Sequence, residues 1–222
     1  DDIWFPNKLN KQLNKIKSSG CDFVMCDYIV NNQLDKTKVK TALDSMPDNA
    51  IILLQLEIPL ETVAHIIETT RGSSRRVILD PAPAPSTALP DNFLNGLYLI
   101  TPNETEATKL SGIEVQDDRS AEAAARKLLA TGVNNVAITM GAKGVVLVQQ
   151  DGVKFIKSPK VAAIDSTAAG DCFNGALAVS IANDLSLEQS VERACRAASI
   201  SVTRKGAQDS MPSKSEVDAC SS

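Results

Sequence analysis

The sequence predicts an α/β protein whose mostly parallel central sheet is covered by helices on both faces. Short runs of consecutive apolar residues, such as residues 50–56, recur along most of the chain. Longer segments whose apolar residues have helical spacing, such as residues 61–70, lie between these runs. Strands that are apolar throughout are buried on both faces, and their alternation with helices is typical of parallel sheets. At 222 residues the chain fits one domain, residues 1–222.

Each predicted strand is an apolar run bounded by polar residues or by a turn. Residues 50–56 lie between polar flanks, and Pro102 stops the strand at residues 97–101. The last two strands lie on either side of a turn that contains glycine. The predicted strands are residues 50–56, 77–79, 97–101, 136–139 and 145–148.

The predicted helices occupy the segments between and after these strands. Val63 and Ile67 illustrate the helical spacing in residues 61–70. Residues 121–131 are dominated by alanine and leucine, and Gly132 ends that helix. The predicted helices are residues 61–70, 121–131, 172–183 and 187–204.

Other segments are interpreted as loops or carry weaker patterns. Residues 81–85 form a loop, because each proline in them disfavours helix in the preceding residue. Residues 8–18 are interpreted as a lysine-rich, solvated helix and residues 21–30 as a strand. Residues 1–35 are the part of the chain whose structure the sequence predicts least.

Composition and charge exclude several classes of protein. The formal net charge of −4 argues against a nucleic-acid-binding protein, which is usually basic. The sequence has no apolar run of the roughly 18 residues that a membrane span needs, and it does not begin with a signal peptide. The five cysteines form no C-x-x-C pair, and a single histidine leaves metal or triad chemistry short of ligands. We therefore expect a cytoplasmic protein with reduced thiols.

The strongest functional signal is residues 165–171, which precede an apolar helix. Ala168, Ala169 and Gly170 are small, so a phosphate can approach the backbone N–H groups at the start of the helix. Asp171, at the same helix start, can accept a proton from a substrate hydroxyl during phosphoryl transfer. Capping of the helix by Asp171 is the alternative interpretation.

Two further segments are consistent with a phosphate site. Residues 139–144 link two strands, and their glycines permit a tight turn near a nucleotide, although taken alone an ordinary hairpin turn is the favoured interpretation. Residues 101–107 follow a strand and open a helix, which places Asn103 and Glu106 near the carboxyl edge of the sheet. Ligands of open α/β sheets bind at that edge. Helix capping by Asn103, with Glu106 three residues later, is again the alternative.

Taken together and in this order, the motifs resemble the ribokinase (PfkB-type carbohydrate kinase) family. The resemblance extends over residues 37–216. Its most specific strings are residues 55–59, the Asn-x-x-Glu motif of Asn103 and Glu106, residues 165–171 and residues 202–208. The first and last of these favour the ribose kinases within the family. The resemblance implies a ribokinase-like fold and ATP-dependent phosphorylation of a sugar hydroxyl, with D-ribose converted to ribose 5-phosphate.

The resemblance also implies roles for individual residues. Asp171 would be the catalytic base, and Ala168, Ala169 and Gly170 would form an anion hole for the phosphoryl group. Glu57, together with Asp171, would bind the sugar.

ATP, Mg²⁺ and K⁺ are the ligands implied beside the sugar. Glu106 would help to organise Mg²⁺ through water, and Cys195 would lie near the adenine. The residues implied for the nucleotide site are Asn103, Glu106, Thr139, Met140, Gly141, Ala142, Lys143, Gly144, Gly170 and Cys195. Those implied around an activating K⁺, largely through backbone carbonyls, are Asp165, Thr167, Ser201, Arg204, Gly206 and Ser210.

The N-terminal part of the chain departs from the family pattern. Family members carry, upstream, an aspartate and a G-G-x-x-x-N segment for the sugar and a small β lid that forms the usual dimer. This sequence has no G-G dipeptide, and residues 1–35 are too short for those strands. We therefore expect an intact ATP half without the lid and its dimer interface. On this expectation the chain folds, binds nucleotide weakly and does not phosphorylate ribose at a useful rate.

Several alternatives stay open or are excluded at this point. The protein could be another PfkB-family kinase, for fructose, a nucleoside or a keto-deoxy sugar acid, or a non-catalytic remnant that binds nucleotide. A dinucleotide-dependent oxidoreductase is excluded because no G-x-G-x-x-G follows a strand, and a Walker-type NTPase because the sequence has no G-x-x-x-x-G-K-[ST].

Overall fold

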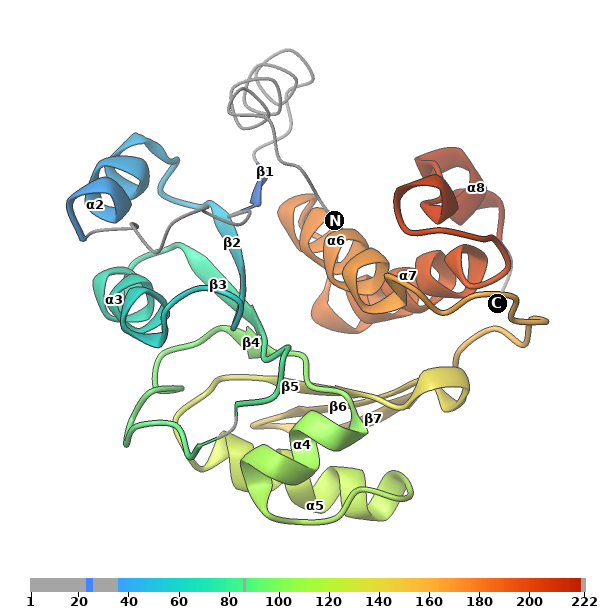
Figure 1. The fold of residues 1–222 in the computed structure, drawn as a ribbon, viewed down its shortest axis with the longest axis horizontal. Helices are drawn as coiled ribbons and strands as arrows, with labels where there is room; N and C mark the ends of the chain where they lie inside the picture. The colour runs from blue at the N-terminus through green and yellow to red at the C-terminus, as the bar shows by residue number, and fades with distance from the viewer. Residues whose placement is uncertain (1–22, 26–35, 86, 221–222) are drawn as a thin grey trace.

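The computed structural model describes residues 23–25, 36–85 and 87–220 (Figure 1). These residues form one sheet of seven strands whose spatial order follows the sequence, β1 to β7. The first five strands are parallel, whereas β6 and β7 are antiparallel to their neighbours. The strands are β1 (Phe23–Met25), β2 (Ile51–Gln55), β3 (Arg76–Asp80), β4 (Leu99–Ile100), β5 (Val136–Thr139), β6 (Val145–Gln149) and β7 (Gly152–Ile156).

Helices follow or connect the strands. The α-helices are α2 (Lys36–Ser45), α3 (Leu60–Thr70), α4 (Glu104–Ser111), α5 (Asp118–Leu129), α6 (Ala169–Ala182), α7 (Leu187–Ser201) and α8 (Lys214–Ala219). Two 3₁₀ turns are η1 (Gly141–Lys143) and η2 (Gln208–Ser210). In Figure 1, α6 and α7 cover one face of the sheet, and α2 to α5 cover the other.

The core consists of two apolar layers, one on each face of the sheet. Along β2, Ile51 and Leu53 pack with α6 and α7, whereas Ile52 and Leu54 pack with α2 and α3. This alternation follows from the two-residue period of a strand. Because both faces are buried, the strand is apolar throughout, as the predicted fold class requires. The predicted α/β architecture is confirmed.

Most of the predicted elements are present, with ends that differ by a few residues. Strand β4 is shorter than predicted, and α7 ends at Ser201 rather than at residue 204. The prediction missed α2, β7 and α8. The predicted helix at residues 8–18 lies outside the described residues, as does most of the predicted strand at residues 21–30, of which Phe23–Met25 is β1.

Across the part of the chain described by the structure, no helix combines the length and apolarity needed to span a membrane.

Candidate active site

The carboxyl ends of neighbouring parallel strands bring polar residues together at one edge of the sheet. Gln55, the last residue of β2, pairs in register with Asp80, the last residue of β3. Past the end of β4, Asn103 forms an isolated parallel bridge with Thr139 at the end of β5. Ligands of open α/β sheets bind at this edge. The predicted position of Asn103 is therefore confirmed.

Helix α6 begins beside the same edge. Its N-cap residue, Ala168, has left-handed backbone angles (φ 58°, ψ 17°), which cost a residue other than glycine roughly 1–2 kcal/mol. The backbone N–H groups of Gly170 and Asp171 donate no hydrogen bond within the described chain. A Cβ added at Gly170 would meet no atom within 4 Å. The start of α6 thus presents accessible N–H donors, as an anion hole requires.

The Asp171 side chain does not cap α6. It occupies the third helical position and accepts a hydrogen bond from the Gln55 side chain, with 3.2 Å between Nε2 and Oδ1. The same Gln55 nitrogen donates to Oδ2 of Asp80 at 3.0 Å. The carboxylate is exposed, so it is accessible to a substrate hydroxyl. The capping alternative is therefore wrong, while the role of Asp171 as a base stays a prediction.

Asp80 is a buried carboxyl group that the sequence prediction missed. Burial raises its pKa from the ordinary 3.8 to about 6, and the nearby carboxylates of Glu106 and Asp171 contribute to that rise. The Gln55 hydrogen bond opposes it. An aspartate directly after a buried apolar run was the signal available in the sequence, because such a residue ends a parallel strand at the ligand edge.

Asn103 and Glu106 form a capping box at the start of α4. The Asn103 side chain accepts from the Glu106 N–H at 2.9 Å, and Glu106 Oε2 accepts from the Asn103 N–H at 2.8 Å. The capping interpretation is therefore confirmed for this pair. Capping uses Oε2 of Glu106, and the other carboxylate oxygen accepts no hydrogen bond among the described residues. That second oxygen can therefore bind water or a cation while the capping box stays intact.

The carboxylates of Asp80, Glu106 and Asp171 provide the type of ligand that Mg²⁺ prefers. Mg²⁺ takes oxygen ligands, keeps several waters, and is usually held by one or two carboxylates and the phosphates of the substrate. In the described part of the chain, no three His, Cys, Asp or Glu side chains come close enough to enclose a metal directly. The residues present therefore fit an ion held through water and phosphate rather than in a protein cage.

Residues 139–144 form the turn between β5 and β6. The N–H of Met140 donates to the Gly144 carbonyl at 2.8 Å, so the hairpin interpretation is confirmed. A Cβ on Gly144 (φ 113°) would lie 2.0 Å from the carbonyl oxygen of Ile156, so this glycine is required by packing against the end of β7. Gly141 has open space around it, whereas Lys143 donates to the Gln116 carbonyl at 2.9 Å. Contact of this turn with ATP stays a prediction.

Two other predicted residues differ in accessibility. Cys195, on α7, has 2% of its surface exposed and packs in the core, and burial raises the pKa of its thiol to about 11. Its side chain offers no open surface for an adenine in this structure. Glu57 is exposed in the turn that follows β2, two residues beyond Gln55.

Most of the residues predicted around K⁺ lie in two loops that Asp165 holds together, whereas Ser201 ends α7 and Ser210 lies in η2. Its carboxylate accepts from the Thr167 N–H and hydroxyl and from the Gly206 N–H at 3.0 Å. These donors lower the pKa of Asp165 to about 2. Arg204 pairs with Glu216 of α8, and Ser201 and Ser210 are buried.

Free carbonyl groups in these loops fit a monovalent cation. In the described residues, the carbonyl oxygens of Thr167, Arg204 and Gly206 accept no hydrogen bond. Unpaired carbonyls beside a carboxylate that is ionised at neutral pH are suitable ligands for such an ion. The assignment of K⁺ stays a prediction.

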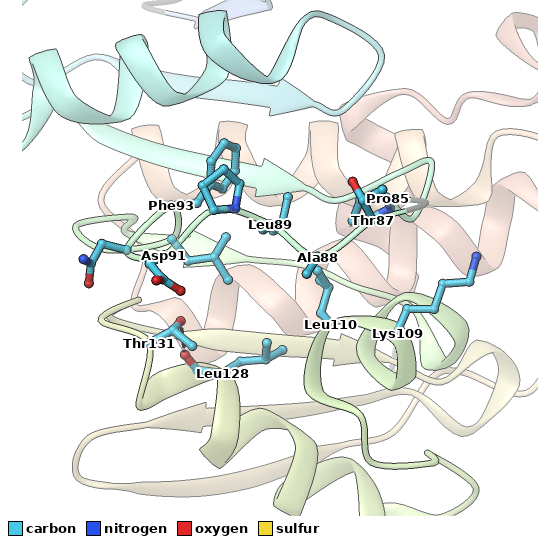
Figure 2. A pocket seen from close by; sticks show the side chains of 13 residues that line it. Pro85, Thr87, Ala88, Leu89, Asp91, Phe93, Lys109, Leu110, Leu128 and Thr131 are labelled. Atoms are coloured by element: carbon cyan, nitrogen blue, oxygen red, sulfur yellow. Dashed lines mark hydrogen bonds between the residues drawn. The ribbon is translucent and has the colours of Figure 1, made fainter.

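A separate cavity of about 550 Å³ lies beneath residues 87–94, between that loop and helices α4 and α5 (Figure 2). Phe93 from that loop, Leu110 of α4 and Leu128 of α5 are among its apolar lining residues. None of the predicted site residues lines it. The polar edge at the strand ends, rather than this cavity, carries the groups suited to phosphoryl transfer.

Comparison with known proteins identifies the family. Residues 8–214 match the model of the pfkB family carbohydrate kinases. The chain belongs to the pfkB family of carbohydrate kinases. The match to the family model begins at residue 8. The resemblance described from the motifs begins further along the chain, at residue 37.

Similarity to individual members of the pfkB family is high over most of the chain. It is 39% identical to a ribokinase of Haemophilus influenzae over 90% of this chain and 64% of that protein. It is 36% identical to a deoxyribokinase of Salmonella typhi over 82% of this chain and 60% of that protein. The structure of an Arabidopsis thaliana ribokinase complexed with ribose and ATP matches with a TM-score of 0.75 and 30% identity, over 87% of this chain and 60% of that one. The chain thus spans less than two thirds of the length of these relatives.

Proposed function

We propose that the protein in its natural full length transfers the γ-phosphoryl group of ATP to a sugar hydroxyl. The observation that carries this proposal is the start of α6, where the exposed carboxylate of Asp171 adjoins the free N–H groups of Gly170 and Asp171. Phosphoryl transfer needs a base for the attacking hydroxyl and donors for the charge on the phosphoryl oxygens. Membership of the pfkB family supports the same reaction.

In the proposed reaction, the sugar hydroxyl oxygen forms a bond to the γ-phosphorus. The bond from that phosphorus to the oxygen that bridges the β- and γ-phosphates breaks, and ADP leaves. The hydroxyl proton moves to the Asp171 carboxylate. The N–H groups at the start of α6 stabilise the negative charge on the phosphoryl oxygens, since they are fixed in place by the helix.

Mg²⁺ bound to ATP would neutralise phosphate charge during transfer. Asp80, Glu106 and Asp171 would face that ion, with Glu106 acting through water. Thr139 and Gly141 would lie along the nucleotide, because the β5–β6 turn adjoins Asn103. K⁺ would be bound by the loops around Asp165 and Gly206, which precede α6 and follow α7.

D-ribose is the first candidate substrate. Similarity to ribokinases, one of them described in complex with ribose and ATP, supports it. The deoxyribokinase of Salmonella typhi, at 36% identity, makes 2-deoxyribose the second candidate. Glu57 is exposed two residues beyond Gln55, and it would hydrogen-bond the sugar.

The test is a substrate panel with the full-length protein and Mg-ATP, with ADP release measured and the phosphorylated product identified by ³¹P NMR. The panel contains ribose, 2-deoxyribose, fructose and adenosine. We expect the highest kcat/KM with ribose. A preference for 2-deoxyribose would change the substrate and keep the reaction, whereas no transfer to any member would contradict the proposal. The 222-residue chain, assayed in parallel, tests the separate prediction that it binds nucleotide without useful turnover.

A further inference from the structure

The Gln55 side chain connects two carboxylates that come from distant parts of the chain. Its Nε2 atom donates to Oδ2 of Asp80 at 3.0 Å and to Oδ1 of Asp171 at 3.2 Å. An amide nitrogen carries two N–H groups, so these two bonds use its whole donor capacity. Both partners are acceptors when ionised, and this fixes the orientation of the amide.

The anchor of this bridge is rigid. Gln55 and Asp80 are the paired last residues of two central parallel strands. The backbone ladder continues one step further, because the Leu56 N–H donates to the Ala82 carbonyl at 2.9 Å. Asp80 is buried, with 6% of its surface exposed, so the carboxylate that holds the other side of the amide has little freedom. Asp171, by contrast, is exposed and lacks other described side-chain partners.

We propose that Gln55 is a positioning residue that holds Oδ1 of Asp171, which leaves Oδ2 of the same carboxylate to accept the proton of the sugar hydroxyl. This inference rests on the proposed kinase function. Without Gln55 the exposed carboxylate would sample several rotamers, and loss of alignment by about 1 Å can cost on the order of 100-fold in rate.

The chemistry of glutamine suits this role. A lysine or arginine at residue 55 would pair with Asp171 and weaken it as a base, because an adjacent positive charge stabilises the ionised carboxylate strongly. A glutamate would add a further negative charge beside Asp80. The neutral amide orients the carboxylate without placing a further charge beside it.

The test compares full-length wild type with Gln55→Met, which has a similar shape and no donor. Gln149→Met is the matched control, because Gln149 also ends a strand, is also half-buried, and donates from Nε2 to Asn135 at 2.9 Å away from the site. For Gln55→Met we expect kcat to fall about 10- to 100-fold with KM for ATP changed less than about twofold. The control should keep the wild-type kcat.

A merely structural role predicts a different result: kcat per folded molecule within about twofold of wild type, which would overturn the proposal. If Gln55→Met does not fold, Gln55→Asn serves instead, because its shorter amide cannot reach both carboxylates. Crystal structures provide a readout independent of activity. We expect the Asp171 carboxylate in one position in the wild type and displaced or split in the variant. An unchanged Asp171 would overturn the inference even if the full-length protein proved not to be a kinase.

Discussion

The carboxylate of Asp165 accepts a hydrogen bond from the backbone N–H of Gly206, 41 residues further along the chain. This bond joins the loop before α6 to the loop after α7. The N–H of Asp165 also donates to the carbonyl of Val202, so the two loops are held at two points. Because the first loop ends at Ala168 and Gly170 lies in the first turn of α6, a change in the second loop can alter the geometry of the proposed anion hole.

We expect K⁺ to activate the full-length protein through these loops. A cation bound by their free carbonyls would keep the start of α6 in place, so kcat should rise when K⁺ replaces a bulky organic cation at constant ionic strength. In Asp165→Ala the response should be lost. An equal rate with both cations, or an undiminished K⁺ response in the variant, would remove the cation site from this account.

Asp80 should make the stability of the chain depend on pH. Its pKa is about 6 in the folded protein and ordinarily 3.8, so the folded state binds the proton more tightly. The contribution of this residue to stability is therefore fully present below about pH 4 and is lost as the pH rises through about 6. Asp80→Asn lacks this dependence and keeps an acceptor for Gln55.

We compare the free energy of unfolding of Asp80→Asn with that of the wild type at each pH. The variant's value minus the wild-type value should increase from pH 4 to pH 7, by up to about 3 kcal/mol. Urea denaturation at several pH values measures the difference. A difference that is constant across this range would show that Asp80 is not a buried, destabilised carboxylate.

Gly144 should tolerate no side chain. Its φ of 113° and the Ile156 carbonyl oxygen 2.0 Å from an added Cβ predict that Gly144→Ala lowers the free energy of unfolding by more than about 2 kcal/mol. Gly152→Ala is the control, because a Cβ at Gly152 would meet no atom within 4 Å. Equal stability of the two variants in urea denaturation would contradict the packing described for the β5–β6 turn.

Most of the fold could be predicted from the sequence because the signals are local. The central strands are apolar throughout because both of their faces are buried, and the helices between them show a 3.6-residue period of apolar residues. Strand β7 lacks such a signal, since it is an edge strand and exposes Phe155 next to Lys154. Helix α8 is six residues long and begins with a Ser213–Glu216 capping box, too short a segment for a periodic pattern.

The candidate site could be predicted only in part. Asp171, Asn103 and Glu106 stand in recognisable local motifs, and the structure brings all three to the carboxyl edge. The contact between Gln55 and Asp171 joins residues 116 positions apart, and no local pattern encodes it. The burial of Asp80 likewise depends on the elements packed around the end of β3. Long-range packing, rather than local propensity, determines both.

The central claim is that Asp171 is the base of a sugar kinase, and kcat of full-length Asp171→Asn with ribose and Mg-ATP tests it most directly. The amide keeps the shape of the side chain and cannot accept the proton, and general-base assistance contributes about 10²- to 10⁴-fold. We predict a loss of at least that size, with the affinity for ATP, measured by calorimetry, nearly unchanged. A variant that kept more than about a tenth of the wild-type kcat would contradict the account.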